Sequence, residues 1–413
     1  MEANIEEKLA AKGGILIEGP KWCGKSTTSK RYAKTVVELQ KSNVLKQYEM
    51  FVAMGDENMF RGEKPIMFDE WQEVPELWDN IRAYVDDSEG RGQFILTGSA
   101  KPVEGKRRHS GTGRIAKMLM RTMSLWESGD STGEVSLTKL FSGADKIGGK
   151  NDHNLNRLAF LTCRGGWPGI MFDKDKAALQ ASFDYLRGLA DEDIVDVDGI
   201  RRNPARARAI LKAYARNIST PARMSTIQND VAANDAALDP KTLDSYINAF
   251  RKLFVIEDIE AWSPSIRSKT AIRTTNIRQF TDPSIATAAL GVSPNDLIND
   301  LKTFGLVFET MAVRDLRVYA ENMNGKVYQY HDADGLEADA VIHLDNGKWG
   351  AAEIKLGGDE HIEKAAKNLL KLKTKINTEK MGEPSFLMVV TGTQYSYARP
   401  DGVLVVPIGC LKN

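Results

Sequence analysis

The stretch GILIEGPKWCGKST, residues 14–27, decides the fold of the chain. Its first five residues are a short apolar run, which predicts a buried strand. The run leads directly into the pattern G-x-x-x-x-G-K-[ST], which is complete from Gly19 to Ser26. The two glycines of this pattern let backbone N–H groups turn inward around phosphate oxygens. With a helix expected over residues 29–40, the sequence predicts a strand, a phosphate-binding loop and a helix in succession.

The residues of this loop have expected roles toward a nucleoside triphosphate. The ammonium group of Lys25 would reach the β- and γ-phosphates, and the hydroxyl group of Ser26 would bind Mg²⁺. We therefore expect ATP and Mg²⁺ as cofactors. The expected nucleotide-binding residues are Gly19, Pro20, Lys21, Trp22, Cys23, Gly24, Lys25, Ser26 and Thr27.

Two further apolar runs end in residues that suit ATP hydrolysis. PIMFDE, residues 65–70, predicts a strand that ends in two acids. Asp69 is expected in the metal shell beside Ser26, and Glu70 is expected to orient or deprotonate the attacking water. QFILTGS, residues 93–99, predicts a third strand, at whose end Thr97 or Ser99 would sense the γ-phosphate by a hydrogen bond.

The whole chain has the composition of a globular protein. It has 413 residues, of which 42% are hydrophobic and 27% are charged, and its formal net charge is zero. A basic field of the whole molecule is therefore excluded as an argument for nucleic-acid binding. No apolar run approaches the roughly 18 residues of a membrane span, and the N-terminus has no apolar region of a secretory signal. Three widely spaced cysteines favour a reducing compartment, so we expect a cytoplasmic protein without a membrane partner.

Basic residues gather in segments 101–121, 201–216 and 266–278. Either these segments form a split anion-binding surface, with DNA as the expected partner, or they are solvated faces of helices and loops. In the first segment Arg114 is the expected catalytic arginine, as an arginine finger or a DNA contact. Further candidates in the same segment are Arg107, Arg108 and Arg121.

Six short motifs together resemble one known group of proteins. GPKWCGKST, FDEWQ, LTGSA, MSLWESG, RGGWPG and FTDP are similar, in this order, to motifs of the prokaryotic AAA-type ATPases with a C-terminal nuclease-like domain of unknown function. The resemblance covers nearly the whole chain, although that family usually has a longer stretch ahead of the phosphate-binding loop. It implies an ATPase core, a winged-helix segment and a domain similar to the PD-(D/E)XK nucleases. It also implies a homo-oligomer or a partner protein.

The middle of the chain is predicted to be helical. Asp239 followed by Pro240 is a good helix start, with an N-cap and a proline in the first turn. Residues 226–232 are a candidate first helix of a helix-turn-helix, and FVIEDIEAW, residues 254–262, begins a candidate wing. Two interpretations stay open. Residues 241–252 enter the major groove of DNA, or the winged helix is a lid of the ATPase or a subunit contact.

The C-terminal region carries a D…E-x-K pattern made by Asp339, Glu353 and Lys355. Residues 345–347, Asp-Asn-Gly, predict a three-residue hairpin loop, which places residue 339 opposite residue 353. The three side chains then share one face of the hairpin. Two converging carboxylates repel each other unless a cation lies between them, and a hard divalent metal suits such an oxygen site. Lys355 would position or activate the attacking water.

Glu309 is the expected third acid of this site. It lies on the apolar stripe of a helix predicted over residues 302–320, where a lone carboxylate is costly unless it has a partner. In proteins similar to the PD-(D/E)XK nucleases, a helical glutamate commonly completes the site. The expected catalytic residues are therefore Lys25, Asp69, Glu70, Ser99, Arg114, Glu309, Asp339, Glu353 and Lys355, and the expected metal ligands are Ser26, Asp69, Asp339 and Glu353.

These observations predict an α/β protein with three domains. Residues 1–195 are expected to form an AAA-type P-loop ATPase domain, a parallel sheet with helices on both faces. Residues 196–290 are expected to form a helical or winged-helix domain, and residues 291–413 an α/β restriction-endonuclease-like domain. The expected function is Mg²⁺-dependent ATP hydrolysis coupled to a nucleic-acid-directed nuclease-like domain. The alternative is an ATP-dependent switch or interaction module, in defence or regulation, whose nuclease-like domain is inactive.

Overall fold

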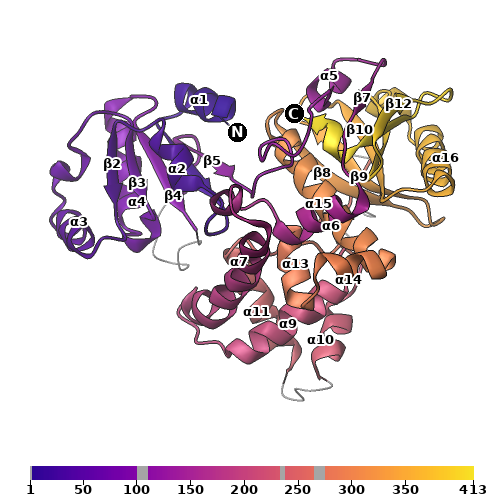
Figure 1. Ribbon diagram of the computed structural model, residues 1–413. Coiled ribbons are helices and arrows are strands. Elements are labelled where there is room, and N and C mark those ends of the chain that lie inside the picture. Colours follow the sequence, from indigo (N-terminus) through magenta and orange to yellow (C-terminus); the bar gives the residue numbers. More distant parts are fainter. Residues whose placement is uncertain (1, 100–109, 233–237, 265–274) are drawn as a thin grey trace. The chain divides into compact units, whose positions relative to one another are not determined.

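The computed structural model describes residues 2–99, 110–232, 238–264 and 275–413 (Figure 1). The chain divides into two compact units. Unit 1 comprises Met1–Arg121, Asp191–Arg202 and Asn248–Phe254, and unit 2 comprises Thr122–Ala190, Asn203–Ile247 and Val255–Asn413. Residues 122–190 cluster with the C-terminal region and not with the phosphate-binding loop. The boundaries of the three expected domains, at residues 195 and 290, stay a prediction.

A five-stranded parallel sheet forms the centre of unit 1, with strand order β2-β3-β4-β1-β5. Its strands are β1 (Gly14–Glu18), β2 (Thr35–Glu38), β3 (Ile66–Asp69), β4 (Phe94–Gly98) and β5 (Ile115–Leu119). The three predicted strands are confirmed as β1, β3 and β4. They occupy the middle of the sheet, where both faces are buried and continuous apolar runs are typical.

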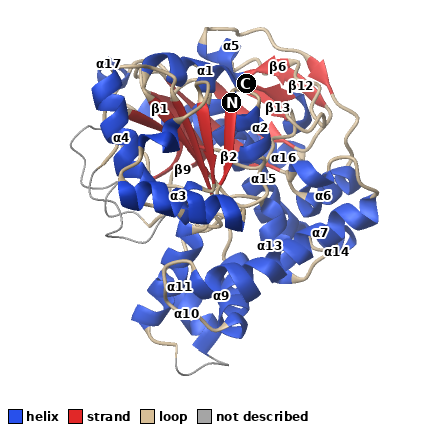
Figure 2. Cartoon of the chain, turned by 90° about the vertical axis from the view of Figure 1, so that its left-hand side faces the viewer, coloured by secondary structure: helices blue, strands red, loops and turns tan. Residues whose placement is uncertain are grey.

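Helices cover both faces of this sheet, as predicted. The helices of unit 1 are α1 (Glu2–Ala11), α2 (Lys25–Lys30), α3 (Ser42–Met54), α4 (Leu77–Ser88) and α8 (Ile194–Asp196). Ile5 of α1 packs with Ile15 and Ile17 on one face. Tyr48 of α3 and Trp78 of α4 pack with Leu16 and other residues of the opposite face. Figure 2 shows α3 and α4 beside the red strands.

The helix predicted over residues 29–40 is wrong for most of its length. Helix α2 ends at Lys30, and residues 35–38 form the edge strand β2, which pairs with β3 from Thr35 opposite Ile66. Thr35, Val36 and Val37 are β-branched, and such side chains favour the pleated surface of a sheet over a helix. Pairing with β3 therefore overrides the helical pattern.

Unit 2 combines a helical part with a second sheet. Its helices are α5 (Leu137–Phe141), α6 (Leu155–Arg164), α7 (Asp175–Gly188), α9 (Pro204–Arg216), α10 (Met224–Ala232), α13 (Pro283–Leu290), α14 (Pro294–Asn299), α15 (Leu301–Glu321), α16 (Asp359–Lys375) and α17 (Thr378–Met381). Helix α11 (Pro240–Lys252) contains residues of both units. The predicted start of α11 is confirmed, since Thr242 N donates to Asp239 Oδ1 at 2.9 Å. The predicted helix over residues 302–320 is confirmed as α15.

The segment predicted as a wing forms two isolated antiparallel bridges, Ile256 with Phe280 and Ile259 with Ile277. Most of its basic tip, with Arg267, Lys269 and Arg273, lies outside the described residues. The winged helix therefore stays a prediction.

The sheet of unit 2 has seven strands in the order β7-β12-β13-β11-β10-β9-β8. They are β7 (Gly149–Lys150), β8 (Gly325–His331), β9 (Glu337–Leu344), β10 (Trp349–Lys355), β11 (Leu387–Thr391), β12 (Tyr395–Ala398) and β13 (Leu404–Pro407), and β6 (Val135–Ser136) pairs separately with β14 (Leu411–Lys412). Strands β10, β11 and β13 are parallel, whereas β8, β9 and β10 are antiparallel.

The predicted register of the β9–β10 hairpin is confirmed. Leu344 N donates to Lys348 O at 2.9 Å, and Gly347 adopts a φ of 86°, the left-handed conformation that the loop requires. Ala340 is paired with Ala352, so residue 339 lies opposite residue 353 in the same register.

A buried ion-pair network explains why three of the short motifs occur together in unit 2. Arg314 of α15 lies 3.2 Å from Asp282 of the FTDP motif and 2.7 Å from Asp315. Asp282 accepts hydrogen bonds from Thr122 Oγ1 at 2.6 Å and from Gly166 N of RGGWPG at 2.9 Å. Asp315 accepts one from Leu125 N of MSLWESG at 2.9 Å. Each buried charge has a partner. The network thus connects segments that are distant in sequence to helix α15.

Candidate nucleotide site and carboxylate cluster

The phosphate-binding loop of unit 1 connects β1 to α2. Gly24 has a φ of 100°, which places the start of α2 at Lys25. A Cβ atom at Gly19 would lie 2.0 Å from the carbonyl oxygen of Met120, so only glycine fits there. The loop therefore has the close backbone turn that a phosphate cradle needs.

Lys25 is buried inside this loop. Its Nζ donates to the carbonyl oxygens of Gly19 at 2.9 Å and Pro20 at 2.8 Å, and its relative exposure is 4%. In the described part of the chain, no carboxylate forms an ion pair with it. Its positive charge is therefore held only by dipoles, and an anionic ligand is the partner that would neutralise it.

Lys21, Trp22 and Cys23 of the loop differ in their burial and in their partners. Lys21 pairs with Asp193 at 2.5 Å, within unit 1, and Trp22 is 46% exposed. Cys23 is fully buried, and burial raises the pKa of its thiol above the usual value. The thiol is thus kept neutral beside Lys25.

Asp69 lies at the carboxyl end of β3 and accepts two hydroxyl hydrogen bonds. Ser26 Oγ donates to Asp69 Oδ1 at 2.7 Å, and Thr97 Oγ1 donates to the same oxygen at 2.5 Å. Ser26 and Asp69, the two predicted metal ligands of this site, are thus in direct contact. Hard oxygen donors of this kind suit Mg²⁺. The amide of Gln40, 3.5 Å from Asp69 Oδ2, also lies here, and no sequence pattern marked it.

Glu70 follows Asp69 in the left-handed conformation, with a φ of 56°. Its Oε2 accepts hydrogen bonds from Ser99 N at 3.2 Å, from Ser99 Oγ at 3.0 Å and from Gln72 Nε2 at 2.5 Å. A non-glycine residue in this conformation is uncommon and is often found at functional sites. The structure thus brings Glu70 and Ser99 together, with Ser99 fixing the orientation of the carboxylate.

Arg114 does not lie with these residues. It precedes β5, and its carbonyl oxygen accepts from Gly14 N at the amino end of β1, whereas the loop follows the carboxyl end of β1. Its Nε donates to Asp86 Oδ1 at 2.6 Å. Within unit 1, Arg114 therefore lies at the amino ends of the strands, whereas Lys25 lies at their carboxyl ends. Arg107 and Arg108 lie outside the described residues, and the catalytic arginine stays a prediction.

In unit 2 the three expected acids of the D…E-x-K site lie around Lys355. Lys355 Nζ lies 2.8 Å from Asp339 Oδ2 and 2.7 Å from Glu353 Oε2. Asp339 also accepts from Ile354 N at 2.7 Å. The charges of Asp339, Lys355 and Glu353 all act on Glu309 of α15. The structure thus brings together residues that are separated in sequence.

The electrostatics of this carboxylate cluster favour protonated acids. Burial, followed by the negative charge of Asp339, raises the pKa of Glu353 to about 7. The same two causes raise the pKa of Glu309 well above its usual value. Burial lowers the pKa of Lys355, but its two carboxylate partners more than compensate, so its pKa is raised.

The cation between the two carboxylates is Lys355. We expected a divalent metal in that place, and a metal there would require the ammonium group to move. Across residues 2–99, 110–232, 238–264 and 275–413, no group of three or more His, Cys, Asp or Glu side chains has an arrangement that could hold a metal ion. Glu353 Oε1 is nevertheless buried and has no hydrogen-bond partner among those residues. The metal-binding role of Asp339 and Glu353 stays a prediction.

Ser219 is a residue of this cluster that sequence reasoning missed. It has a φ of 54°, and its Oγ donates to Leu306 O at 2.9 Å. The Ser219 hydroxyl also lowers the pKa of Glu309, against the effect of burial. Asp339 and Glu353 lie on a covered face of the hairpin. Helix α16 packs on Val341 and Ala351, which belong to the same face.

Two arginines of the predicted basic segments are also not surface residues. Arg202 is 5% exposed and makes hydrogen bonds of 2.6 Å and 3.0 Å to Asp198. Arg278 is 6% exposed and lies 2.8 Å from Asp258. Buried ion pairs of this kind do not contact a phosphate, so the anion-binding interpretation is wrong for these two residues.

Three parts of the chain match known families. Residues 12–128 match a family described as an AAA domain. Residues 155–296 match a domain of unknown function (DUF8612), and residues 304–411 match another (DUF4143). No curated protein matches the chain. No helix in the described part of the chain is long and apolar enough to cross a membrane.

Solved structures resemble the chain only weakly. A Walker-type ATPase of Pyrococcus abyssi matches with 16% identity and a TM-score of 0.44, over 70% of this chain and 94% of that one. A DNA replication initiation factor matches with 13% identity and a TM-score of 0.23, over 60% and 85%. A signal transduction ATPase with a tetratricopeptide repeat sensor from Pyrococcus horikoshii matches with 11% identity and a TM-score of 0.19, over 78% and 48%.

The family match and the geometry of the loop agree on the class of unit 1. Residues 12–128 match an AAA domain and contain a parallel sheet with the phosphate-binding loop at the carboxyl end of β1.

Proposed function

We propose that the protein is a Mg²⁺-dependent ATPase whose second unit is a nuclease-like module directed at nucleic acid. The observation that carries the ATPase part is the meeting of Lys25, Asp69 and Glu70 at one edge of the sheet, each with a separate set of hydrogen-bond partners. Nothing in the described residues neutralises Lys25 by an ion pair, as expected for a lysine that receives phosphate oxygens.

The roles divide among the residues of unit 1 as follows. Lys25 binds the β- and γ-phosphates, and Ser26 and Asp69 are the oxygen donors for Mg²⁺. When bound, Mg²⁺ neutralises charge on the phosphates. Glu70 orients the attacking water or accepts a proton from it. The hydrogen bond from Ser99 fixes the orientation of the Glu70 carboxylate.

Steady-state ATP hydrolysis by Glu70→Gln tests this assignment. The variant keeps the shape of the site and its hydrogen bonds, so ATP affinity should stay within about twofold, while kcat falls by about 100-fold or more. Glu73→Gln is the matched control, since Glu73 is an exposed acid three residues along the chain, and it should hydrolyse at the parental rate. Parental hydrolysis by Glu70→Gln would mean that another group activates the water.

For unit 2 we infer a fold similar to the PD-(D/E)XK nucleases and DNA as the partner. The support is the cluster itself, because Asp339, Glu353 and Lys355 meet at β9 and β10, with Glu309 of α15 acting on them. A winged-helix arrangement of α10, α11 and the bridges that follow them, and assembly into an oligomer, belong to the same proposal.

The alternative function also has an observation in its favour. Lys355 already forms ion pairs with both carboxylates, as expected of a cluster that serves the fold and does not cleave. In that case the protein is an ATP-dependent switch or interaction module.

Calorimetric titration with Mn²⁺ distinguishes the two functions of unit 2. It is made in a Lys25→Ala background without ATP, so that the loop does not contribute. The nuclease proposal expects divalent binding that Asp339→Asn abolishes, metal-dependent cleavage of labelled DNA or RNA that Asp339→Asn and Lys355→Ala both abolish, and unchanged ATP turnover when Asp339→Asn is made in the parental chain. Binding that does not depend on Asp339, with no cleavage, favours the switch.

A further inference from the structure

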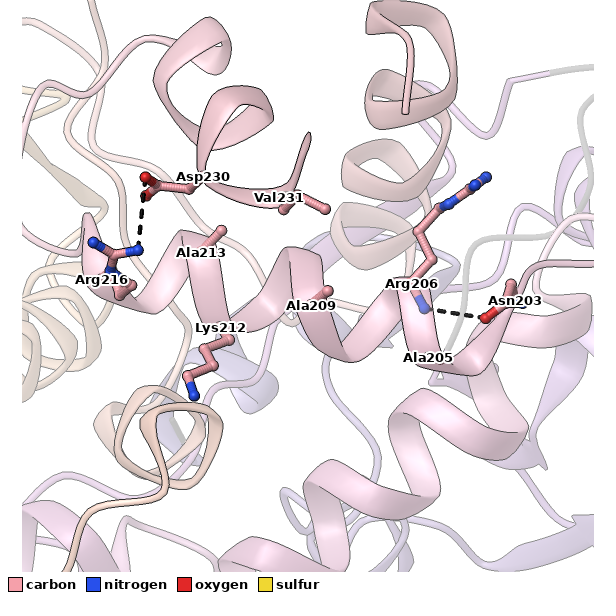
Figure 3. A pocket seen from close by; sticks show the side chains of 9 residues that line it. All are labelled: Asn203, Ala205, Arg206, Ala209, Lys212, Ala213, Arg216, Asp230 and Val231. Atoms are coloured by element: carbon pink, nitrogen blue, oxygen red, sulfur yellow. Dashed lines mark hydrogen bonds and ion pairs between the residues drawn. The ribbon is translucent and has the colours of Figure 1, made fainter. Parts of the chain in front are cut away.

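A groove in unit 2 lies between α9 and α10, away from the carboxylate cluster in sequence. Its volume is about 450 Å³. Arg206, Lys212 and Arg216 of α9 line it, together with Asp230 and Val231 of α10. Figure 3 shows Arg206 and Arg216 toward opposite ends of α9, with Ala209 and Ala213 between them.

The floor of this groove is made of small side chains. Ala205, Ala209 and Ala213 follow one another at intervals of four residues, which places them on one face of α9. Alanine leaves the helix backbone open to close approach by a ligand. It offers no deep apolar pocket of the kind that anchors a bound peptide.

The charge of the groove is positive. Its lining has three cationic side chains, Arg206, Lys212 and Arg216, and one acid, Asp230. Asp230 is compensated within the protein, because Arg216 lies 3.6 Å from it and Asn217 Nδ2 donates to it at 3.1 Å. The N-cap of α9 at Asn203 also lines the groove, where the positive end of the helix dipole adds to the cationic side chains.

The spacing of the cations fits a repeating anion. Arg206 and Lys212 are separated by six residues of helix, hence by roughly 9 Å along its axis. One strand of a DNA duplex carries about two or three phosphates over that axial length. An acidic peptide would need apolar anchors in addition to charge, and the lining offers Val231 and alanines only.

We propose that this groove binds the phosphodiester backbone of a nucleic acid, with Arg206 and Lys212 as phosphate contacts. The proposal rests on the nucleic-acid partner of the proposed function and assigns it a surface. It also divides the predicted basic segment 201–216, because Arg202 is buried in an ion pair and Arg208 is not in the lining.

Fluorescence anisotropy with a labelled DNA duplex tests the proposal on the full chain, in EDTA and without ATP. Arg206→Gln with Lys212→Gln should weaken binding about tenfold or more at roughly 0.1 M salt, and reduce the slope of log K against log salt by about 1.8, or about 0.9 per contact. The control is Arg201→Gln with Arg208→Gln, which removes the same charge from exposed positions outside the groove, and should change affinity less than about twofold. Equal losses in the two double variants, or no binding by the parental protein, overturn the proposal.

A second pair of variants tests the floor without removing a cation. Ala209 is exposed, so both Ala209→Glu and Ala209→Gln should fold, and they differ in charge and hardly in size. Ala209→Glu should weaken duplex binding about fivefold relative to Ala209→Gln. Equal affinities overturn the proposal.

Competition arms identify the ligand. Unlabelled duplex, single-stranded DNA and RNA distinguish the source of the phosphodiester backbone, and competition by any of them supports the proposal. Displacement by polyglutamate as effective as by duplex indicates an acidic protein partner and overturns it. ATP hydrolysis of the groove variants should be parental, so a failure of the groove and a failure of the ATPase assignment are separate results.

Discussion

The phosphate-binding loop of unit 1 and the carboxylate cluster of unit 2 each hold a lysine among oxygen atoms. Around Lys25 these oxygens are the neutral carbonyls of Gly19 and Pro20, whereas around Lys355 they are the carboxylates of Asp339 and Glu353. Among the described residues, Lys25 has no ion-pair partner. The charge of Lys355 is compensated by two carboxylates of the protein.

The acids show the same difference. Asp69 and Glu70 each accept hydrogen bonds from hydroxyl groups, and they have separate partners. In unit 2, by contrast, burial and then the negative charge of Asp339 raise the pKa of Glu309 and Glu353. The acids of unit 1 are therefore stabilised by neutral hydroxyl donors. A site with crowded acids depends on a cation, and Lys355 supplies one.

The largest expected effect concerns the crowded acids and pH. Folded Glu353 keeps a proton between its usual pKa of 4.5 and about 7, whereas the unfolded chain releases it. The free energy of unfolding should therefore fall as pH rises through this window, by about 3 kcal/mol. Glu353→Gln should flatten this dependence, measured by urea unfolding at pH 5 and pH 8. An unchanged pH profile in the variant would place the titration elsewhere.

Removal of Lys355 is the next largest effect. Lys355→Met leaves two carboxylates without their shared cation, and this should cost about 2 kcal/mol of stability at pH 8. The side chain of Lys355 is 30% exposed, so water lessens the loss relative to a fully buried pair. The loss should shrink at pH 5, where Glu353 is protonated. Lys367→Met is the control, since its pair with Glu363 is exposed, and it should cost less than about 0.5 kcal/mol.

The smallest expected effect concerns the residue that orients Glu70. Ser99→Ala removes one of the hydrogen bonds to the carboxylate, so kcat for ATP hydrolysis should fall about fivefold to tenfold, which corresponds to about 1 kcal/mol. Ser29→Ala is a matched control, because Ser29 Oγ is buried and has no partner among the described residues. If Ser29→Ala lowers kcat as much as Ser99→Ala, the contact to Glu70 is not the cause.

Much of this arrangement could be predicted because it depends on local sequence. Gly19 and Gly24 mark the loop, and the two acids after β3 mark its partners. The hairpin register follows from alternation and from Gly347, and it correctly places residue 339 opposite residue 353. Residues 35–38 were predicted in a helix because their pairing with β3 is a long-range contact that a local pattern does not contain.

The partners of buried charges were less predictable. No pattern indicates that Lys355 lies between two acids or that α16 covers the hairpin face. These contacts depend on which elements pack together, and the packing is decided by the whole chain. The position of Arg114 next to β5, at the amino end of β1, was likewise not predicted, and its role as an arginine finger or a DNA contact stays a prediction.

Thermal unfolding with and without ATP and Mg²⁺ tests the difference between the two lysines most directly. A ligand that binds only the folded protein stabilises it by about 2.7 kcal/mol at a concentration of about 100 times its Kd. ATP and Mg²⁺ should raise the Tm of the parental protein and of Lys355→Met by similar amounts, and should leave the Tm of Lys25→Met unchanged. A full ATP-dependent rise in Lys25→Met, or its loss in Lys355→Met alone, would contradict the assignment of the loop as the ATP site.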